Sequence, residues 1–131
     1  MPTHLATCHC GQLRVHADGE PVRVSVCHCL ACQRRTGSAF GVQARYAAER
    51  VRVEGRASEH VRISDEGEER IFSFCPRCGS TVTWRTADAP ELVAIAVGAF
   101  ADPGFTAPSR SIYEARRHPW VGLPEGLTSE P

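Results

Sequence analysis

Three cysteines within six residues, Cys27, Cys29 and Cys32, constrain this chain more than any other feature of its sequence. In the run of residues 27–32 (CHCLAC), a tight turn can bring all three sulfur atoms to one side of the backbone. Three thiolates fill three corners of a zinc tetrahedron and leave the fourth position open, as in catalytic rather than structural zinc sites. We therefore expect the chain to fold around a metal centre at this motif.

The other four cysteines form two pairs that lie far apart in the sequence. Cys8 and Cys10 belong to a C-x-C-G knuckle, and Cys75 and Cys78 belong to a C-x-x-C-G knuckle. Joined together, the two pairs make a closed four-thiolate site, which is the structural type of zinc site. Because structural zinc binding contributes directly to the free energy of folding, we expect this second site to fasten the early part of the chain to a late hairpin.

A histidine lies between the two cysteines of each C-x-C pair. His28 could complete the fourth corner of the three-cysteine site, and His9 could bind at the other, but neighbouring side chains tend to point apart. We therefore expect both histidines to face away from the metals, either at the surface or beside the ligands. Two purely structural zinc sites remain an alternative. A redox C-x-x-C is disfavoured because no βαβ pattern accompanies either motif.

Bulk properties exclude several other classes of protein. The 131 residues fit a single domain, residues 1–131, with a formal net charge of zero, which argues against nucleic-acid and membrane-surface partners. No apolar run approaches the ~20 residues that a membrane span requires. The first residues lack the features of a signal peptide, so we expect a cytoplasmic location, where cysteines serve as metal ligands more often than as disulfides. All fifteen basic residues are arginine, which excludes Schiff-base chemistry on a lysine.

Hydrophobic patterning predicts a mainly β protein with one short helical turn. Short segments alternate apolar and polar residues, and turn signals separate them. A helix is expected over residues 30–36, ending at Gly37, and the tail after Phe100 is expected to be mostly loop. The predicted strands are residues 13–16, 22–26, 39–45, 51–54, 60–64, 70–74, 81–84 and 92–97, the last of which is apolar throughout and therefore expected to be central.

Arg34 and Arg35 directly follow the three-cysteine motif. A guanidinium group matches the geometry of a carboxylate, so these two side chains are candidates for binding a substrate carboxylate beside the metal. A position on the solvent-facing side of the helix is the alternative for each.

Taken together, these motifs resemble those of the glutathione-dependent formaldehyde-activating enzyme (GFA) family, whose domain also occurs in centromere protein V. The matching stretches are residues 8–11 (CHCG), 27–40 (CHCLACQRRTGSAF), 74–80 (FCPRCGS) and the pair Pro119-Trp120. The resemblance runs from about residue 6 to about residue 121, and residues 122–131 form a tail.

Several expectations follow from this resemblance. It implies a β-tent-like fold of coiled antiparallel sheets with zinc knuckles. It implies two Zn²⁺ per chain, a structural one on Cys8, Cys10, Cys75 and Cys78 and a catalytic one on Cys27, Cys29 and Cys32. It also implies a carbon–sulfur lyase that joins glutathione, or a related small thiol, to formaldehyde, or reverses that reaction. A non-enzymatic zinc-binding or interaction module with the same fold is the alternative.

Overall fold

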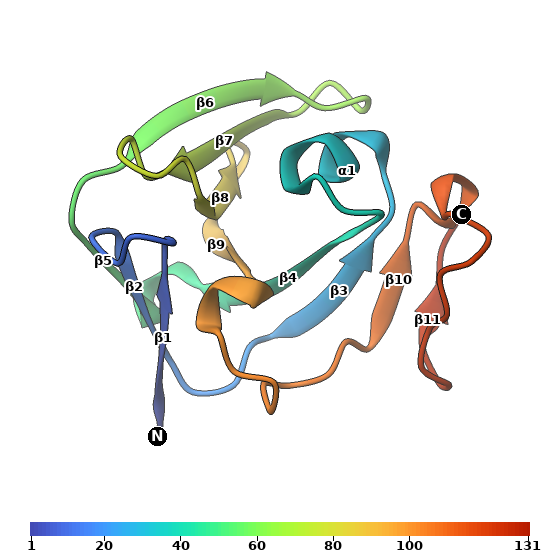
Figure 1. The fold of residues 1–131 in the computed structure, drawn as a ribbon, viewed down its shortest axis with the longest axis horizontal. Helices are drawn as coiled ribbons and strands as arrows, with labels where there is room; N and C mark the ends of the chain where they lie inside the picture. The colour runs from blue at the N-terminus through green and yellow to red at the C-terminus, as the bar shows by residue number, and fades with distance from the viewer.

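The computed structural model describes residues 1–131 and contains two β-sheets (Figure 1). The small sheet has the strand order β1-β2-β5, and the large sheet has the order β11-β10-β3-β4-β9-β8-β7-β6. The strands are β1 (Thr3–Thr7), β2 (Arg14–Asp18), β3 (Arg23–Cys27), β4 (Gly41–Ala47), β5 (Val51–Glu54), β6 (Ser58–Ile63), β7 (Glu69–Phe74), β8 (Thr81–Thr86), β9 (Ala89–Ala96), β10 (Arg110–Ile112) and β11 (Thr128–Ser129). The helices are α1 (Leu30–Thr36) and three short 3₁₀ helices, η1 (Ala48–Arg50), η2 (Val97–Phe100) and η3 (Glu114–Arg116).

The large sheet is strongly bent, and α1 lies inside the bend. Figure 1 shows the β6–β7 hairpin at one end of the sheet and the β10–β11 pair at the other, with α1 between them. Most neighbouring strands are antiparallel, but β10 runs parallel to both β3 and β11. The helices of the structure are too short to cross a membrane.

The prediction of a mainly β fold with one short helix is confirmed. The helix spans Leu30–Thr36 as expected, and Gly37 ends it in the left-handed conformation with a φ of 70°. A residue without a Cβ atom adopts this conformation without strain, which is why the glycine marks the helix end. Strand β9 is central, as its apolar sequence predicted, since it pairs with β4 on one side and β8 on the other.

The structure has more strands than the patterning predicted. Strand β1 was not expected, and the tail after Phe100 contains β10, η3 and β11 where loop was predicted. Strands β10 and β11 have only three and two residues, too few to show an alternating pattern. Strand β10 forms because β3, more than eighty residues earlier, offers it a parallel partner, with Ser111 opposite Val26.

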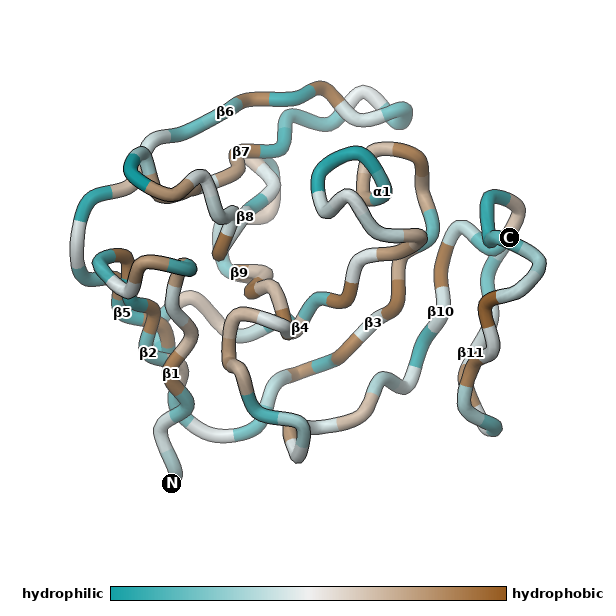
Figure 2. The backbone as a smooth tube through the Cα atoms, in the orientation of Figure 1, coloured by the Kyte–Doolittle hydropathy of each residue, from teal (hydrophilic) through white to brown (hydrophobic).

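The apolar core lies between the small sheet and the middle of the large sheet. Its buried residues come from β1, β2, β3, β4, β8 and β9, from η2 and from the adjoining loops, and they include Leu13, Val15, Tyr46, Val82 and Ile95. Figure 2 shows apolar segments recurring along β3 and β4, whereas the end of the β6–β7 hairpin is hydrophilic. The core leaves the concave side of the large sheet, around α1, available for a polar site.

Candidate metal centres and their pocket

The four cysteines outside the central motif come together as predicted. Cys8 and Cys10 lie in the β1–β2 connection, Cys75 and Cys78 lie in the β7–β8 turn, and their sulfur atoms all lie within 4.8 Å of one another. The Cys8–Cys10 and Cys10–Cys75 sulfur separations are 3.6 and 3.7 Å. Four sulfurs bound to zinc at about 2.3 Å in a tetrahedron are about 3.8 Å apart. The cluster therefore has the spacing that a tetrahedral metal ion requires.

Hydrogen bonds from backbone and side chains prepare this four-cysteine cluster for negative charge. The Gln12 amide nitrogen donates to the Cys75 sulfur at 3.0 Å, and the Leu13 N–H donates to the Cys8 sulfur at 3.3 Å. The Ser80 hydroxyl, followed by the backbone N–H groups of Ser80 and Cys10, lowers the pKa of Cys78 to about 5. Stabilised thiolates are the form in which cysteine binds a metal cation.

The second cluster is built where β3 passes into α1. Cys27 ends β3, Cys29 caps the N-terminus of α1, and Cys32 lies in its first turn, with all three sulfurs within 4.8 Å of one another. The Cys29 sulfur accepts a hydrogen bond from the Cys32 N–H at 3.3 Å. Hydrogen bonds from the Cys27 and Cys32 thiols, and then from backbone N–H groups, hold the pKa of Cys29 well below that of an ordinary thiol. This group of three can also hold a metal ion.

His28 faces away from the three-cysteine cluster, as the alternation of side chains predicted. Its ring is fully buried, and its Nε2 lies 2.9 Å from the Ser111 hydroxyl on β10. The Gln33 amide donates to the His28 carbonyl oxygen at 2.9 Å. His28 therefore fastens the start of α1 to β10, and it contributes to the site by positioning the cysteines on either side of it. His9 lies on the surface, outside the four-cysteine cluster.

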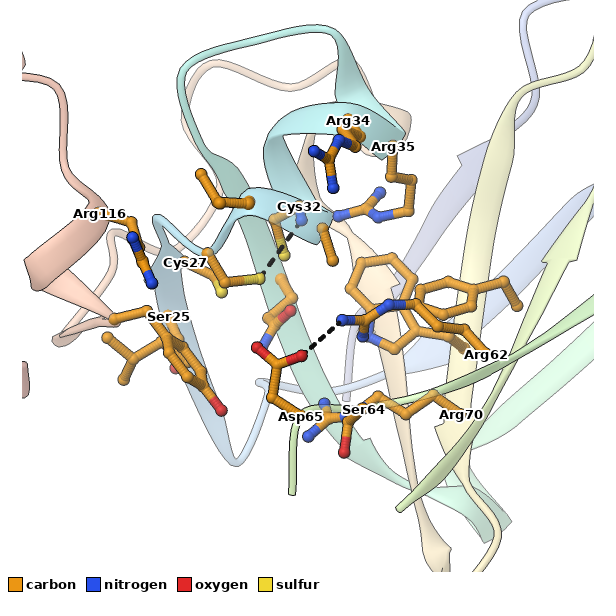
Figure 3. A pocket seen from close by; sticks show the side chains of 18 of the residues that line it. Ser25, Cys27, Cys32, Arg34, Arg35, Arg62, Ser64, Asp65, Arg70 and Arg116 are labelled. Atoms are coloured by element: carbon orange, nitrogen blue, oxygen red, sulfur yellow. Dashed lines mark hydrogen bonds and ion pairs between the residues drawn. The ribbon is translucent and has the colours of Figure 1, made fainter. Parts of the chain in front are cut away.

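A cavity of about 860 Å³ opens beside the three-cysteine cluster (Figure 3). Cys27, Cys29 and Cys32 all line it, whereas none of the four cysteines of the other cluster does. The two clusters thus differ in surroundings as well as in ligand number. Only the three-cysteine cluster can offer a metal ion both an open position and a space from which a ligand reaches it.

Arg34 and Arg35 both line the cavity. The guanidinium carbon of Arg35 lies 4.2 Å from the ring centroid of Trp84, which is only 4% exposed. This stacking fixes the direction of the Arg35 side chain. Arg34 is more exposed, and Figure 3 shows it beside Arg35 at the edge of the pocket.

The cavity contains more arginines than the sequence analysis singled out. Eight of the fifteen arginines of the chain line it, against three acidic side chains. The arginines are Arg23, Arg34, Arg35, Arg45, Arg62, Arg70, Arg110 and Arg116, and the acidic residues are Asp65, Glu66 and Glu130. A sequence signal for one of them, Arg23, exists. Because side chains two apart on a strand share a face, Ser25 and Arg23 must lie on the same side of β3 as Cys27.

A comparison with protein families supports the resemblance found in the motifs. The profile of the family described as "Glutathione-dependent formaldehyde-activating enzyme" matches residues 3–116. The chain belongs to the GFA family. The matched region of this GFA chain contains both cysteine clusters and all eight arginines of the cavity.

The fold of this GFA chain is also seen in a solved structure. A crystal structure of a Rhodobacter sphaeroides protein is 21% identical, covers 78% of this chain and 90% of that chain, and superposes with a TM-score of 0.57. At this level of identity the similarity concerns the fold. No curated protein matches the chain.

Proposed function

We propose that this chain is a cytoplasmic, zinc-dependent carbon–sulfur lyase of the GFA type, which forms or cleaves a thiol–aldehyde adduct such as S-hydroxymethylglutathione. The observation that carries the proposal is the position of the three-cysteine cluster at the wall of the arginine-lined cavity. A purely structural cluster has no need of an adjoining cavity, and none of the four cysteines of the other cluster lines this one.

The donor sets of both clusters suit zinc. Thiolates are soft ligands that select zinc over the hard divalent cations, and a four-sulfur set with tetrahedral spacing is typical of structural zinc. We therefore assign a structural zinc to the four-cysteine cluster and a second, catalytic zinc to Cys27, Cys29 and Cys32. When bound by three thiolates, zinc supplies an open position at which a substrate thiol binds in its deprotonated, nucleophilic form.

The residues around the three-cysteine cluster would hold and orient that substrate. Cys29 is kept in a form ready to bind metal by its neighbours' hydrogen bonds. Arg34 and Arg35, on the helix that carries Cys32, would bind a carboxylate of the thiol, which is supported by their position in the cavity lining and by the packing of Arg35 on Trp84. The metal would then fix the sulfur while the guanidinium groups fix the rest of the molecule, so that the aldehyde meets the sulfur in one orientation.

Spectroscopy at the zinc edge tests the proposal. With two zincs per chain, X-ray absorption should give a mean of about 3.5 sulfurs per zinc, rising to about 4 when glutathione fills the open position. S-methylglutathione, which cannot form a thiolate, should leave the number unchanged. The protein should also accelerate the exchange of ¹³C-formaldehyde with S-hydroxymethylglutathione, measured by NMR.

Substitution of the two helix arginines tests their role. Hydrogen bonds to charged groups contribute about 1.5–3 kcal/mol, so Arg34→Ala or Arg35→Ala should weaken glutathione binding by roughly tenfold or more without loss of zinc. If saturating glutathione leaves the zinc coordination unchanged and S-methylglutathione binds equally well, the proposed function is wrong. The non-enzymatic zinc module then becomes the better description.

A further inference from the structure

The face of β3 and β4 that lines the cavity connects the three-cysteine cluster to a distant pair of arginines. Cys27, Ser25 and Arg23 alternate along β3 and share this face. On β4, Gln43 lies opposite Ser25 and Arg45 lies opposite Arg23. Cys27 and Arg23 are four positions apart on β3, which corresponds to a Cα distance of about 13 Å. The cavity therefore has a sulfur-rich end and, further along the same wall, an arginine-rich region.

The arginines of this region lack adequate partners within the protein. Arg23 and Arg45 lie directly opposite each other on the adjacent strands β3 and β4, yet neither forms an ion pair. Arg70, which lines the same cavity, reaches only Glu68, at 3.8 Å. The Nε atoms of Arg23, Arg45 and Arg70 are buried and have no hydrogen-bond partner in the protein.

This arrangement is costly for the free protein. Like charges placed directly opposite each other in a sheet destabilise it, and a buried donor without an acceptor costs desolvation energy. Burial, followed by the charges of Arg23 and Arg70, lowers the pKa of Arg45, which reflects the same crowding of positive charge. A bound anion would supply both the negative charge and the hydrogen-bond acceptors that these arginines lack. Anion binding therefore explains the arrangement of the arginines, which the stability of the fold alone does not.

The polar residues between the two ends suit a single extended ligand. Ser25 and Gln43 are 2% and 4% exposed, and both line the cavity between the cysteine end and the arginine end. Two other arginines of the cavity have carboxylate partners, Arg62 with Asp65 at 3.8 Å and Arg110 with Glu130. Arg23, Arg45 and Arg70 stand out among the eight because only their Nε atoms are buried without a hydrogen-bond partner, so they are the set that remains for an external anion.

We propose that Arg23, Arg45 and Arg70 form an anion subsite that binds the end of the substrate away from its sulfur atom, and that this end carries two or more negative charges. The statement about sulfur rests on the proposed function, but the subsite itself does not. Glutathione, with two carboxylates and one ammonium group, has a net charge of −1 at neutral pH. The subsite thus points to a small thiol with more negative charge than glutathione, either phosphorylated or rich in carboxylates.

Sulfur-free anions test the subsite separately from the zinc chemistry. Calorimetry on the zinc-loaded protein would use glycerol 3-phosphate and propane-1,2,3-tricarboxylate, with the zinc content measured before and after. Arg45→Gln and Arg23→Gln should each weaken anion binding about tenfold or more, because each removes a charge-assisted hydrogen bond. Arg45→Lys should restore part of the affinity. Arg14→Gln, on the exposed side of β2, is the matched control and should bind as the unaltered protein does.

The two anions also distinguish the two sources of charge. Tighter binding of the phosphate ester indicates a phosphorylated thiol, and tighter binding of the tricarboxylate indicates a carboxylate-rich one. Binding that survives in Cys29→Ser, or in a protein that fails to turn over glutathione and formaldehyde, supports the subsite even if the proposed function fails. If neither anion binds, or if both arginine-to-glutamine variants bind as tightly as the control, the subsite is refuted whatever the turnover.

Discussion

Replacing Gly55 by alanine should disturb the four-cysteine cluster indirectly, through Gln12. Gly55 follows β5 with a φ of 91°, and a Cβ atom there would lie 2.0 Å from the Gln12 carbonyl oxygen. Gln12 connects this loop to the cluster, because its side-chain amide bonds the Arg56 backbone at 2.7 and 2.9 Å and the Cys75 sulfur at 3.0 Å. An added methyl group must therefore displace the Gln12 backbone, and with it the side chain that donates to the Cys75 sulfur.

The expected loss of stability has two parts. Placing a non-glycine residue in the left-handed region costs roughly 1–2 kcal/mol. Overpacking against a fixed neighbour costs about 1–3 kcal/mol more, since the contact is with backbone and cannot be relieved by a rotamer change. The sum, about 2–5 kcal/mol, is a large share of the ~5–15 kcal/mol that stabilises a typical domain.

Gly67 in the β6–β7 turn offers a matched control. It has a φ of 81°, but a Cβ atom there would meet nothing within 4 Å, so Gly67→Ala carries only the first part of the cost. Urea unfolding followed by the fluorescence of the buried Trp84 measures both variants, and the zinc content reports on the cluster. Equal losses of stability in the two variants would show that the collision with Gln12 does not matter.

Two further predictions concern the cysteines and the buried histidine. Cys8→Ser should unfold or aggregate the protein, because structural zinc supplies on the order of 10 kcal/mol, whereas Cys29→Ser should keep the fold and lose one of two zincs, as metal analysis and circular dichroism would show. An equal loss of stability in Cys8→Ser and Cys29→Ser would mean that the three-cysteine cluster is also a structural site. Ser111→Ala should cost about 1–3 kcal/mol in thermal or urea unfolding, since His28 Nε2 loses its buried partner. Ser109→Ala, at an exposed position nearby, should be close to neutral, and an equal loss there would contradict the argument.

Local patterns in the sequence predicted the helix and several strands, because their causes are local. The segment Leu30–Thr36 ends at a glycine that can take a positive φ, and Val51–Glu54 alternates between turn signals; both elements appear with the predicted bounds. Strand β10 has no such local cause. It exists because Ser111 and its neighbours pair with β3, and that partnership depends on how the whole sheet is arranged.

The arginines that β3 and β4 contribute to the cavity were missed for a related reason. The alternating pattern of an isolated strand predicts that Arg23 and Arg45 face solvent while their neighbours face the core. The bend of the large sheet turns that polar face inward, around α1, so the expected solvent side becomes the wall of a cavity (Figure 1). The position of Cys27 at the end of β3 is the one local sign of this, because it puts a candidate metal ligand on the polar face.

The cysteines of the two clusters differ in their separation along the chain, and this difference sets the order in which the two clusters form. Cys27 and Cys32 are near neighbours in the chain, whereas Cys10 and Cys75 are 65 residues apart. Closing the longer loop costs about 2 kcal/mol more in free energy, and during synthesis Cys75 and Cys78 emerge later than residues 27–32. The weaker, three-thiol site is therefore complete first and meets metal first, while the closed site waits for the β7–β8 hairpin. In refolding with one equivalent of zinc, the thiols of residues 27–32 should resist alkylation before Cys75 does; the reverse order would contradict this.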